Sequence, residues 1–224
     1  MWAVIAAAGR GERLAAPYPK AFAKLADRPL LAESVERLDA SEWIEGIVVV
    51  APPEWEEPAI LLAEELGAAK VAAVVTGGET RTQSVRAGVA EVPPQAAVVL
   101  VHDSARPVLP GDVVERLVTA LAEEWDGAVP AVPVRDTLKR ADGEAVGETV
   151  DRSGLWAAQT PQAFVADALR RALDRGVEAS DCAGLVQSAG GRVRLVPGDA
   201  RLLKVTDGTD LALVDALVAA EKRR

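Results

Sequence analysis

Apolar residues occur along the first half of the chain in two alternating patterns. Continuous apolar runs read as buried strands, and the segments between them carry apolar residues at helical spacing. The strands are predicted at 2–8, 46–51, 71–75, 97–101 and 127–133, and the helices at 30–38, 54–66, 83–92 and 112–125. Strands and helices that alternate in this way are typical of α/β proteins, whose mostly parallel sheet has helices on both faces. We therefore expect a single α/β domain over residues 1–224.

The second half adds a different element, a two-stranded ribbon from about Arg135 to Arg152. Its turn is marked by Asp142-Gly143, a hairpin signal in an otherwise α/β chain. Because an isolated two-stranded ribbon is only marginally stable, it must pack on a partner or on the main body. After the ribbon we expect a loop at 158–164 that leads into a helix, a short strand at 202–205 and a helix from about 207 to the end.

A glycine-rich turn follows the first strand and carries the first candidate chemistry. Gly9 and Gly11 allow backbone N–H groups to approach an anion closely, and Arg13 and Lys20 add two cations. Leu14 stands where a dinucleotide-binding motif needs its third glycine, and no Gly-Lys-Ser/Thr sequence of a P-loop is present. A plain tight turn is the alternative, but two cations beside a glycine turn favour a polyphosphate site.

A second glycine-rich loop at 76–85 comes directly after another predicted strand. Arg81 and Ser84 supply donors at the start of a helix, where partial positive charge favours anions or carbonyl oxygens. A helix start capped by Thr80 or Thr82 explains the same residues equally well.

A third polar segment, 101–107, ends the strand at 97–101. Asp103 is placed to bind a ribose hydroxyl, a polyol hydroxyl or, through water, Mg²⁺. His102 is the single histidine of the chain, and we expect it to be structural, with its ring bonded to neighbouring backbone.

Composition limits the classes of partner. The net charge of -9 and a pI near 4.8 argue against a nucleic-acid or anionic-membrane surface. Cys182 is the only cysteine, which excludes an intrachain disulfide and a cysteine-based zinc cluster. No apolar run reaches transmembrane length and no signal sequence is evident, so we expect a cytoplasmic protein.

Seven short motifs occur together in the order and spacing of one known enzyme family. They are Ala7-Ala8-Gly9-x-Gly11-x-Arg13 with Pro19-Lys20, Gly77-Gly78-x-x-Arg81-x-x-Ser84-Val85, His102-Asp103-x-Ala105-Arg106-Pro107, Asp136-Thr137-x-Lys139, Asp151-Arg152, Gln159-Thr160-Pro161-Gln162 and Lys204-Val205-Thr206. In these motifs the chain resembles, over essentially its whole length, the 2-C-methyl-D-erythritol 4-phosphate cytidylyltransferases of the non-mevalonate isoprenoid pathway.

This resemblance implies a Rossmann-like nucleotidyltransferase fold with a protruding β-hairpin arm. It implies transfer of CMP from CTP to methylerythritol phosphate, with release of pyrophosphate. It also implies a Mg²⁺ ion held mainly by the triphosphate and a homodimer joined through the arm at about 135–152.

The resemblance further implies a role for each matched residue. Arg13 and Lys20 would stabilise charge at the triphosphate, and Arg152 and Lys204 would position the incoming phosphate. The nucleotide would be bound by Gly9 and by five residues that read the cytosine: the backbone around Ala7, Ala8, Gly78 and Glu79, and the side chain of Ser84. Asp103 would meet sugar or polyol hydroxyls near the metal. The pocket for the polyol phosphate would be lined by Arg106, Thr137, Thr160 and Ser180. The other subunit would supply Thr137 and also Arg152.

Elementary chemistry agrees with such a reaction. A phosphate monoester has a second pKa of about 6, so near neutral pH it is mostly a dianion and needs no catalytic base. The difficulty is bringing one anion to another, which is a task for positioned cations and Mg²⁺.

Some positions depart from the family's pattern. Ala21 stands where the family usually has glutamine, Ser104 where it has alanine, and Cys182 where it has aspartate or glutamate. Two other functions remain as alternatives. One is a cytidylyltransferase for a different polyol phosphate such as ribitol phosphate. The other is a non-catalytic nucleotide-binding module, which has no need of Lys20, Arg152 and Lys204 together.

Overall fold

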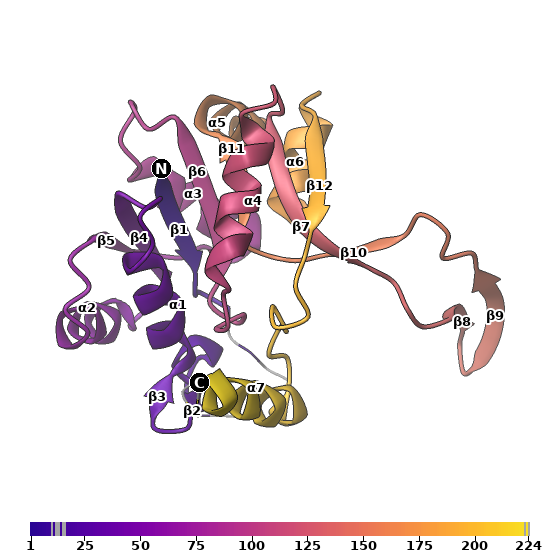
Figure 1. Cartoon of the computed structure of the whole chain (residues 1–224), viewed down its shortest axis with the longest axis horizontal. Helices are drawn as coiled ribbons and strands as arrows, with labels where there is room; N and C mark the ends of the chain where they lie inside the picture. Colours follow the sequence, from indigo (N-terminus) through magenta and orange to yellow (C-terminus); the bar gives the residue numbers. More distant parts are fainter. Residues whose placement is uncertain (10, 12–13, 15–16, 222, 224) are drawn as a thin grey trace.

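A central sheet organises the molecule. The computed structural model describes residues 1–9, 11, 14, 17–221 and 223. In this part of the chain, eight strands form the sheet in the order β10-β7-β11-β6-β1-β4-β5, with β12 paired to β7 (Figure 1). They are β1 (Trp2–Ala6), β4 (Gly46–Ala51), β5 (Val71–Thr76), β6 (Val98–Asp103), β7 (Gly127–Pro133), β10 (Trp156–Ala158), β11 (Gln162–Val165) and β12 (Val193–Pro197). Neighbours among β6, β1, β4 and β5 are parallel, as are β7 and β12, whereas β10 and β11 run antiparallel. The predicted mostly parallel sheet is confirmed.

Helices cover both faces of the sheet because its strands carry apolar side chains on each side. Ala3 and Ile5 of β1 belong to one core cluster, whereas Val4 between them belongs to the other. The first cluster includes residues of α1 (Leu30–Asp39), α2 (Glu56–Glu65) and α4 (Gly111–Leu121). The second includes residues of α3 (Arg81–Ala90), α5 (Ala166–Asp174) and α6 (Cys182–Ser188). The layered α/β architecture predicted from the sequence is therefore present.

A smaller cluster lies beyond the carboxyl ends of the parallel strands. It is formed where α7 (Gly208–Glu221) packs near the hairpin of β2 (Lys24–Leu25) and β3 (Arg28–Pro29), and it buries Val205 and Val214 (Figure 1). The short 3-10 helix η2 (Lys20–Phe22) precedes that hairpin. This packing closes one end of the sheet and holds the segment around Lys20 beside it.

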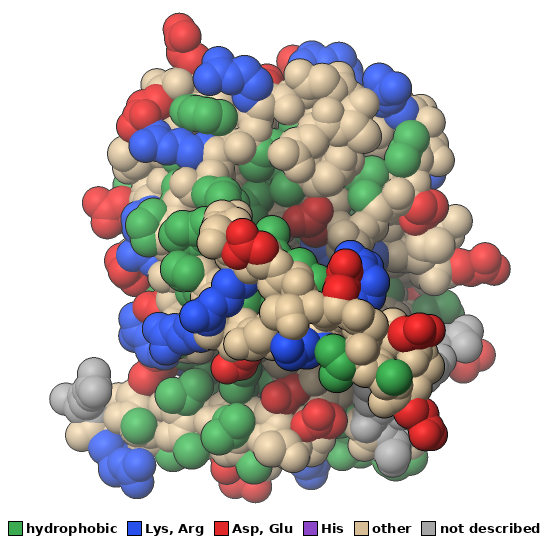
Figure 2. All heavy atoms as spheres, turned by 90° about the vertical axis from the view of Figure 1, so that its right-hand side faces the viewer, with side chains coloured by type: hydrophobic (Ala, Val, Ile, Leu, Met, Phe, Trp, Pro, Cys, Tyr) green, Lys and Arg blue, Asp and Glu red, His purple; other side chains and the backbone are tan. Residues whose placement is uncertain are grey.

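An arm projects from the body between β7 and β10. It consists of β8 (Leu138–Asp142) and β9 (Ala145–Val150), joined at Gly143 with φ +57°, and it extends well away from the other elements (Figure 1). Figure 2 views the molecule from the side of the arm and shows basic and acidic side chains interspersed over that face. The hairpin predicted around Asp142-Gly143 is confirmed.

Two predictions for the second half were wrong. Residues 202–205 do not form a strand, and the strand of this region is β12 at Val193–Pro197. The loop predicted at 158–164 contains the end of β10 and the start of β11. Several boundaries also differ: β1 ends at Ala6, and α4 ends at Leu121, four residues before the predicted end.

Candidate active site

A cleft of about 1460 Å³ opens at the carboxyl ends of β1, β4, β5 and β6. The loops that follow these four strands form its walls, which is where ligands bind in open parallel sheets. Among the predicted nucleotide-binding residues, all seven lie in its lining: Ala7, Ala8, Gly9, Gly78, Glu79, Ser84 and Asp103. Lys20 and Lys204 line it as well. With Arg81, the structure thus brings together three cations and both glycine-rich loops.

The glycine turn after β1 places Lys20 at the cleft. Gly11 has φ +70°, and a Cβ atom built there would lie 2.5 Å from the Cβ of Lys20, so this close approach requires glycine. The Nζ atom of Lys20 donates to the carbonyl of Val205 at 2.9 Å, which ties the turn to the segment that carries Lys204. Arg13, predicted as the other cation of this turn, lies outside the described residues.

The second glycine-rich loop is held by bonds to the start of α3. Ser84 Oγ accepts from the Gly78 N–H at 3.1 Å, and Gln83 Oε1 accepts from the Glu79 N–H at 2.9 Å. Thr80 caps the helix by accepting from the Gln83 N–H, so the predicted cap is real and the loop still lines the cleft. A Cβ on Gly77 would lie 2.2 Å from the Cβ of Ala8, and only glycine lets the two loops meet so closely.

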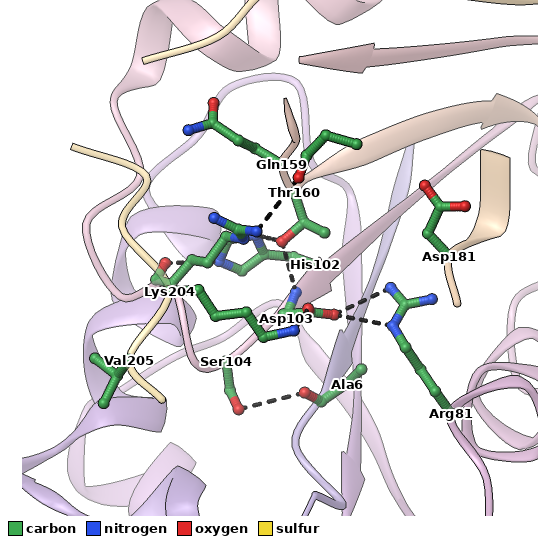
Figure 3. A network of polar contacts seen from close by, with 12 residues as sticks. Ala6, Arg81, His102, Asp103, Ser104, Gln159, Thr160, Asp181, Lys204 and Val205 are labelled. Carbon is green, nitrogen blue, oxygen red and sulfur yellow. Dashed lines mark hydrogen bonds and ion pairs between the residues drawn. The ribbon is translucent and has the colours of Figure 1, made fainter. Parts of the chain in front are cut away.

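Asp103 ends β6 and carries the main charge cluster of the cleft (Figure 3). Its Oδ1 accepts from Nη2 of Arg81 at 3.0 Å, and its Oδ2 accepts from Nζ of Lys204 at 2.8 Å. Burial by itself would raise the pKa of Asp103, but the attraction of Arg81 and Lys204 outweighs it and holds that pKa well below its usual range. Asp103 is therefore an ionised carboxylate on the cleft wall between two cations.

Lys204 reaches this position because its segment is tied to the turn after β6. The Val205 N–H donates to the Ala105 carbonyl at 2.8 Å, and the Arg106 guanidinium donates to the Leu202 carbonyl. Arg106 also donates to the Ala158 carbonyl at 3.5 Å. Its guanidinium thus bonds to backbone in this structure, and Arg106, predicted to contact the polyol phosphate, is not part of the cleft lining.

Four other predicted residues also lie outside the cleft lining. Thr137 and Arg152 are exposed at the base of the arm hairpin, just before β8 and just after β9, and Ser180 is exposed on the loop before α6. Thr160 is buried, and its hydroxyl oxygen accepts from the Asp103 N–H at 3.0 Å. One chain by itself therefore brings together the residues predicted to bind the nucleotide but not the full set predicted for the polyol phosphate.

The sequence predicted a structural His102, and its ring is fully buried at the end of β6. The Nε2 atom lies 3.1 Å from the Arg106 carbonyl oxygen, which is the predicted bond to neighbouring backbone.

Other contacts at the site were not predicted from the sequence. Trp55 and Thr206 line the cleft, and Trp55 packs on Phe22 of η2 with ring centroids 4.5 Å apart. Trp55 follows the strand 46–51 by four residues, so the rule that ligands bind at the carboxyl ends of parallel strands could have identified it.

Cys182, one of the departures from the family's pattern, lies against Arg81. Its Sγ accepts from Nη1 of Arg81 at 3.4 Å. Burial raises the pKa of the Cys182 thiol, so the group beside Arg81 is a neutral thiol. Among the residues that the structure describes, the anionic partner of Arg81 is therefore Asp103, and the thiol beside it adds no charge.

Two classes of feature are absent from the part of the chain that the structure describes. It contains no group of three or more His, Cys, Asp or Glu side chains arranged to hold a metal ion. It also contains no helix that is long and apolar enough to cross a lipid bilayer.

Comparison with known proteins places these observations in one family. The family model of 2-C-methyl-D-erythritol 4-phosphate cytidylyltransferase (IspD) matches residues 1–220. The chain belongs to this family. Among its relatives, the 2-C-methyl-D-erythritol 4-phosphate cytidylyltransferase of Saccharopolyspora erythraea is 45% identical, over 97% of this chain and 98% of the relative. The protein of the same name from Deinococcus radiodurans is 44% identical, over 96% and 88%.

Solved structures of the family have the same fold. The crystal structure of a 4-diphosphocytidyl-2C-methyl-D-erythritol synthase matches with a TM-score of 0.83 at 36% identity, covering 97% of each chain. That of 2-C-methyl-D-erythritol 4-phosphate cytidylyltransferase from Thermus thermophilus matches with a TM-score of 0.80, also at 36% identity, over 96% of this chain and 98% of the other. The Rossmann-like nucleotidyltransferase fold expected from the motifs is therefore confirmed.

Proposed function

We propose that this protein transfers CMP from CTP to 2-C-methyl-D-erythritol 4-phosphate, giving CDP-methylerythritol and pyrophosphate. Membership of the family supports this activity. The observation that carries it is the cleft itself, where Lys20 and Lys204 lie with both glycine-rich loops. A nucleotide-binding module would need the loops but would not need cations from such distant parts of the sequence.

The chemistry follows from the charges of the reactants. The monoester phosphate of the acceptor, a dianion above its second pKa of about 6, attacks the α-phosphorus of CTP. A new P–O bond forms, the bond between the α-phosphorus and the bridging oxygen breaks, and pyrophosphate leaves with the electron pair. Lys20 and Arg13 stabilise the charge that develops on the triphosphate, and Lys204 draws in the acceptor phosphate.

The contacts of Asp103 with Arg81 and Lys204 leave Lys204 able to turn toward a phosphate. Lys204 bonds Asp103 at 2.8 Å, and its side chain is 40% exposed, so it faces solvent in the cleft. Because Arg81 bonds the other oxygen of Asp103, the carboxylate keeps a cationic partner when Lys204 turns to an incoming phosphate. The oxygens of Asp103 can then also accept from sugar or polyol hydroxyls.

We also propose that Mg²⁺ assists the reaction, held mainly by the triphosphate. Mg²⁺ prefers oxygen ligands and is often bound by one or two carboxylates together with substrate phosphates. Both oxygens of Asp103 are bonded to cations, so this carboxylate would meet the ion through water while the triphosphate holds it. When bound, the ion would neutralise charge between the phosphates.

In this proposal the complete active site forms only in a homodimer, in which the arm of each subunit lies at the cleft of the other. The arm reaches away from its own body, and it carries the exposed Thr137 and Arg152 (Figure 1). Apolar side chains are also exposed on and beside it: Val146 at 66%, Leu155 at 40% and Trp156 at 46%. Exposed apolar groups on a thin hairpin favour a partner surface, and a two-fold dimer supplies the same surface twice.

A pyrophosphate-release assay tests the activity. The enzyme is supplied with CTP, Mg²⁺ and either methylerythritol phosphate or ribitol 5-phosphate, and a reaction without an acceptor measures CTP hydrolysis. We expect release that depends on methylerythritol phosphate and exceeds that with ribitol phosphate. A preference for ribitol phosphate would assign another acceptor to the same chemistry, and no release with either acceptor would refute the proposal.

A further inference from the structure

His102 lies at the centre of a hydrogen-bonded chain behind the cleft wall (Figure 3). Its ring is fully buried, with Nε2 at 3.1 Å from the Arg106 carbonyl oxygen and Nδ1 at 3.4 Å from Thr160 Oγ1. The same Thr160 oxygen is 3.0 Å from the backbone nitrogen of Asp103. The chemistry proposed above uses neither the imidazole nor the Thr160 hydroxyl directly.

The direction of each bond follows from what the groups can donate. A carbonyl oxygen only accepts, so the ring nitrogen that faces Arg106 carries the proton. The Thr160 oxygen accepts from the Asp103 N–H, so its own hydroxyl proton is free for Nδ1, and the fully buried ring then carries a single proton, on Nε2. Thr160 then donates its hydroxyl proton to Nδ1, and its lone pair accepts from the Asp103 N–H.

The hydrogen bonds of His102 and Thr160 hold both ends of the turn that carries Asp103. The turn is closed by the Arg106 N–H, which donates to the Asp103 carbonyl at 2.9 Å. His102 bonds directly to the Arg106 carbonyl at the end of the turn. Through Thr160 it also holds the Asp103 N–H at the start of the turn. Ser104 and Ala105 of the turn line the cleft, and Ala105 also binds the segment of Lys204. A shift of the turn would move Asp103 and Lys204 together.

We propose that His102 is a positioning residue, which acts through Thr160 and the Arg106 carbonyl to fix the turn that presents Asp103 and Lys204. The neutral ring with its proton on Nε2 is the one form that satisfies both neighbours at once. His102 transfers no proton during the reaction. The kinetic part of this inference rests on the proposed function, whereas the structural part does not.

The protonated nitrogen can be observed directly in the wild-type enzyme. Because His102 is the only histidine, a sample with ¹⁵N-labelled histidine gives the spectrum of one imidazole. At pH 7.5 we expect a neutral ring with a protonated Nε2 and an unprotonated Nδ1. In Thr160→Val, which removes the hydroxyl and keeps the shape, the Nδ1 resonance should move and Nε2 should remain protonated. A ring protonated on Nδ1, or on both nitrogens, would overturn the proposal without any assumption about the reaction.

A double-mutant cycle then measures the effect on catalysis. His102→Phe removes both bonds of the ring, and we expect kcat/KM for the acceptor to fall about threefold to tenfold, the effect of one net hydrogen bond. Thr160→Val should cause a loss of similar size. The double variant should lose little more than either single variant, because both changes break the same chain. Thr160→Ser, which keeps the hydroxyl, should retain most of the wild-type kcat/KM.

A matched control separates this effect from the loss of a hydroxyl as such. Ser188→Ala removes a hydroxyl that bonds the Leu185 carbonyl at 2.7 Å, at the end of α6 away from the cleft. It should leave kcat/KM unchanged. Unchanged kcat/KM in a folded His102→Phe variant, or fully additive losses in the cycle, would contradict the positioning role. If the wild type lacked the proposed activity, the NMR result would still decide the proton's position, so the two failures are distinguishable.

Discussion

Replacing His102 with glutamine removes a buried ring that titrates differently in the folded and unfolded chain. Burial lowers the pKa of His102 from 6.5 to about 4, with Asp103 raising it and Arg106 lowering it further. Between these values the unfolded chain binds a proton that the folded chain excludes. The free energy of unfolding therefore falls as pH falls below 6.5, and this loss is complete below about pH 4. Linkage gives a loss of about 2 kcal/mol between pH 7 and pH 5.

Urea unfolding followed by tryptophan fluorescence measures this loss. The free energy of unfolding is determined at pH 7 and at pH 5 for the wild type and for His102→Gln. Other groups titrate alike in both proteins, so the difference between the two pH dependences belongs to His102. We expect the wild type to lose about 2 kcal/mol more than the variant over this interval. Equal losses would show that the ring is not held neutral by burial, and the reasoning would be refuted.

Three further predictions concern catalysis. Lys20→Ala should lower turnover on the order of 10²-fold while the protein stays folded, and Arg13→Ala should act similarly, because each removes a cation predicted to stabilise charge at the triphosphate. The acidic limb of kcat/KM against pH should follow the second ionisation of the acceptor phosphate, near 6. Dimers mixed from Arg152→Ala and Lys20→Ala chains should regain up to about half of the wild-type activity per heterodimer, because one site collects both defects and the other has none.

Each of these has a defined contrary result. Near-full turnover in a folded Lys20→Ala variant would remove Lys20 from the reaction. An acidic limb that stayed at the same pH with an acceptor of different phosphate pKa would assign that limb to the enzyme. Heterodimers that form but regain no activity would mean that Arg152 serves its own subunit, and that the arm is only a structural clasp.

The parts of the fold predicted from sequence are those where one pattern dominates. The run at 46–51 is buried on both faces, and it forms β4 with the predicted bounds. The run at 202–205 is apolar for a different reason: Leu202 and Val205 are buried in the core, while their backbone bonds Arg106 and Ala105. Apolar content at such a short segment cannot distinguish a strand from a coil that packs, whereas the true strand β12 carries an exposed Leu195 and an arginine.

The place in the cleft of the residues predicted to bind the nucleotide could be predicted, because these residues follow strands directly in the sequence. The ion pair of Arg81 with Asp103 could not, because it depends on the strand order β6-β1-β4-β5, which the sequence does not specify. The burial of Thr160 was missed for a similar reason. Its hydroxyl bonds the Asp103 N–H because β11 pairs antiparallel with β6. No local sequence pattern predicts that pairing.

The central claim is that a cytidylyl group moves from CTP to a phosphate monoester, and ³¹P NMR of the reaction tests it most directly. The enzyme is incubated with CTP, Mg²⁺ and methylerythritol phosphate, and the spectra are followed with time. The account predicts that the monoester signal disappears as a diphosphate diester appears, with one pyrophosphate released for each diester formed. CTP loss that leaves the monoester signal unchanged would contradict the account, because the enzyme would then hydrolyse the nucleotide without transferring it.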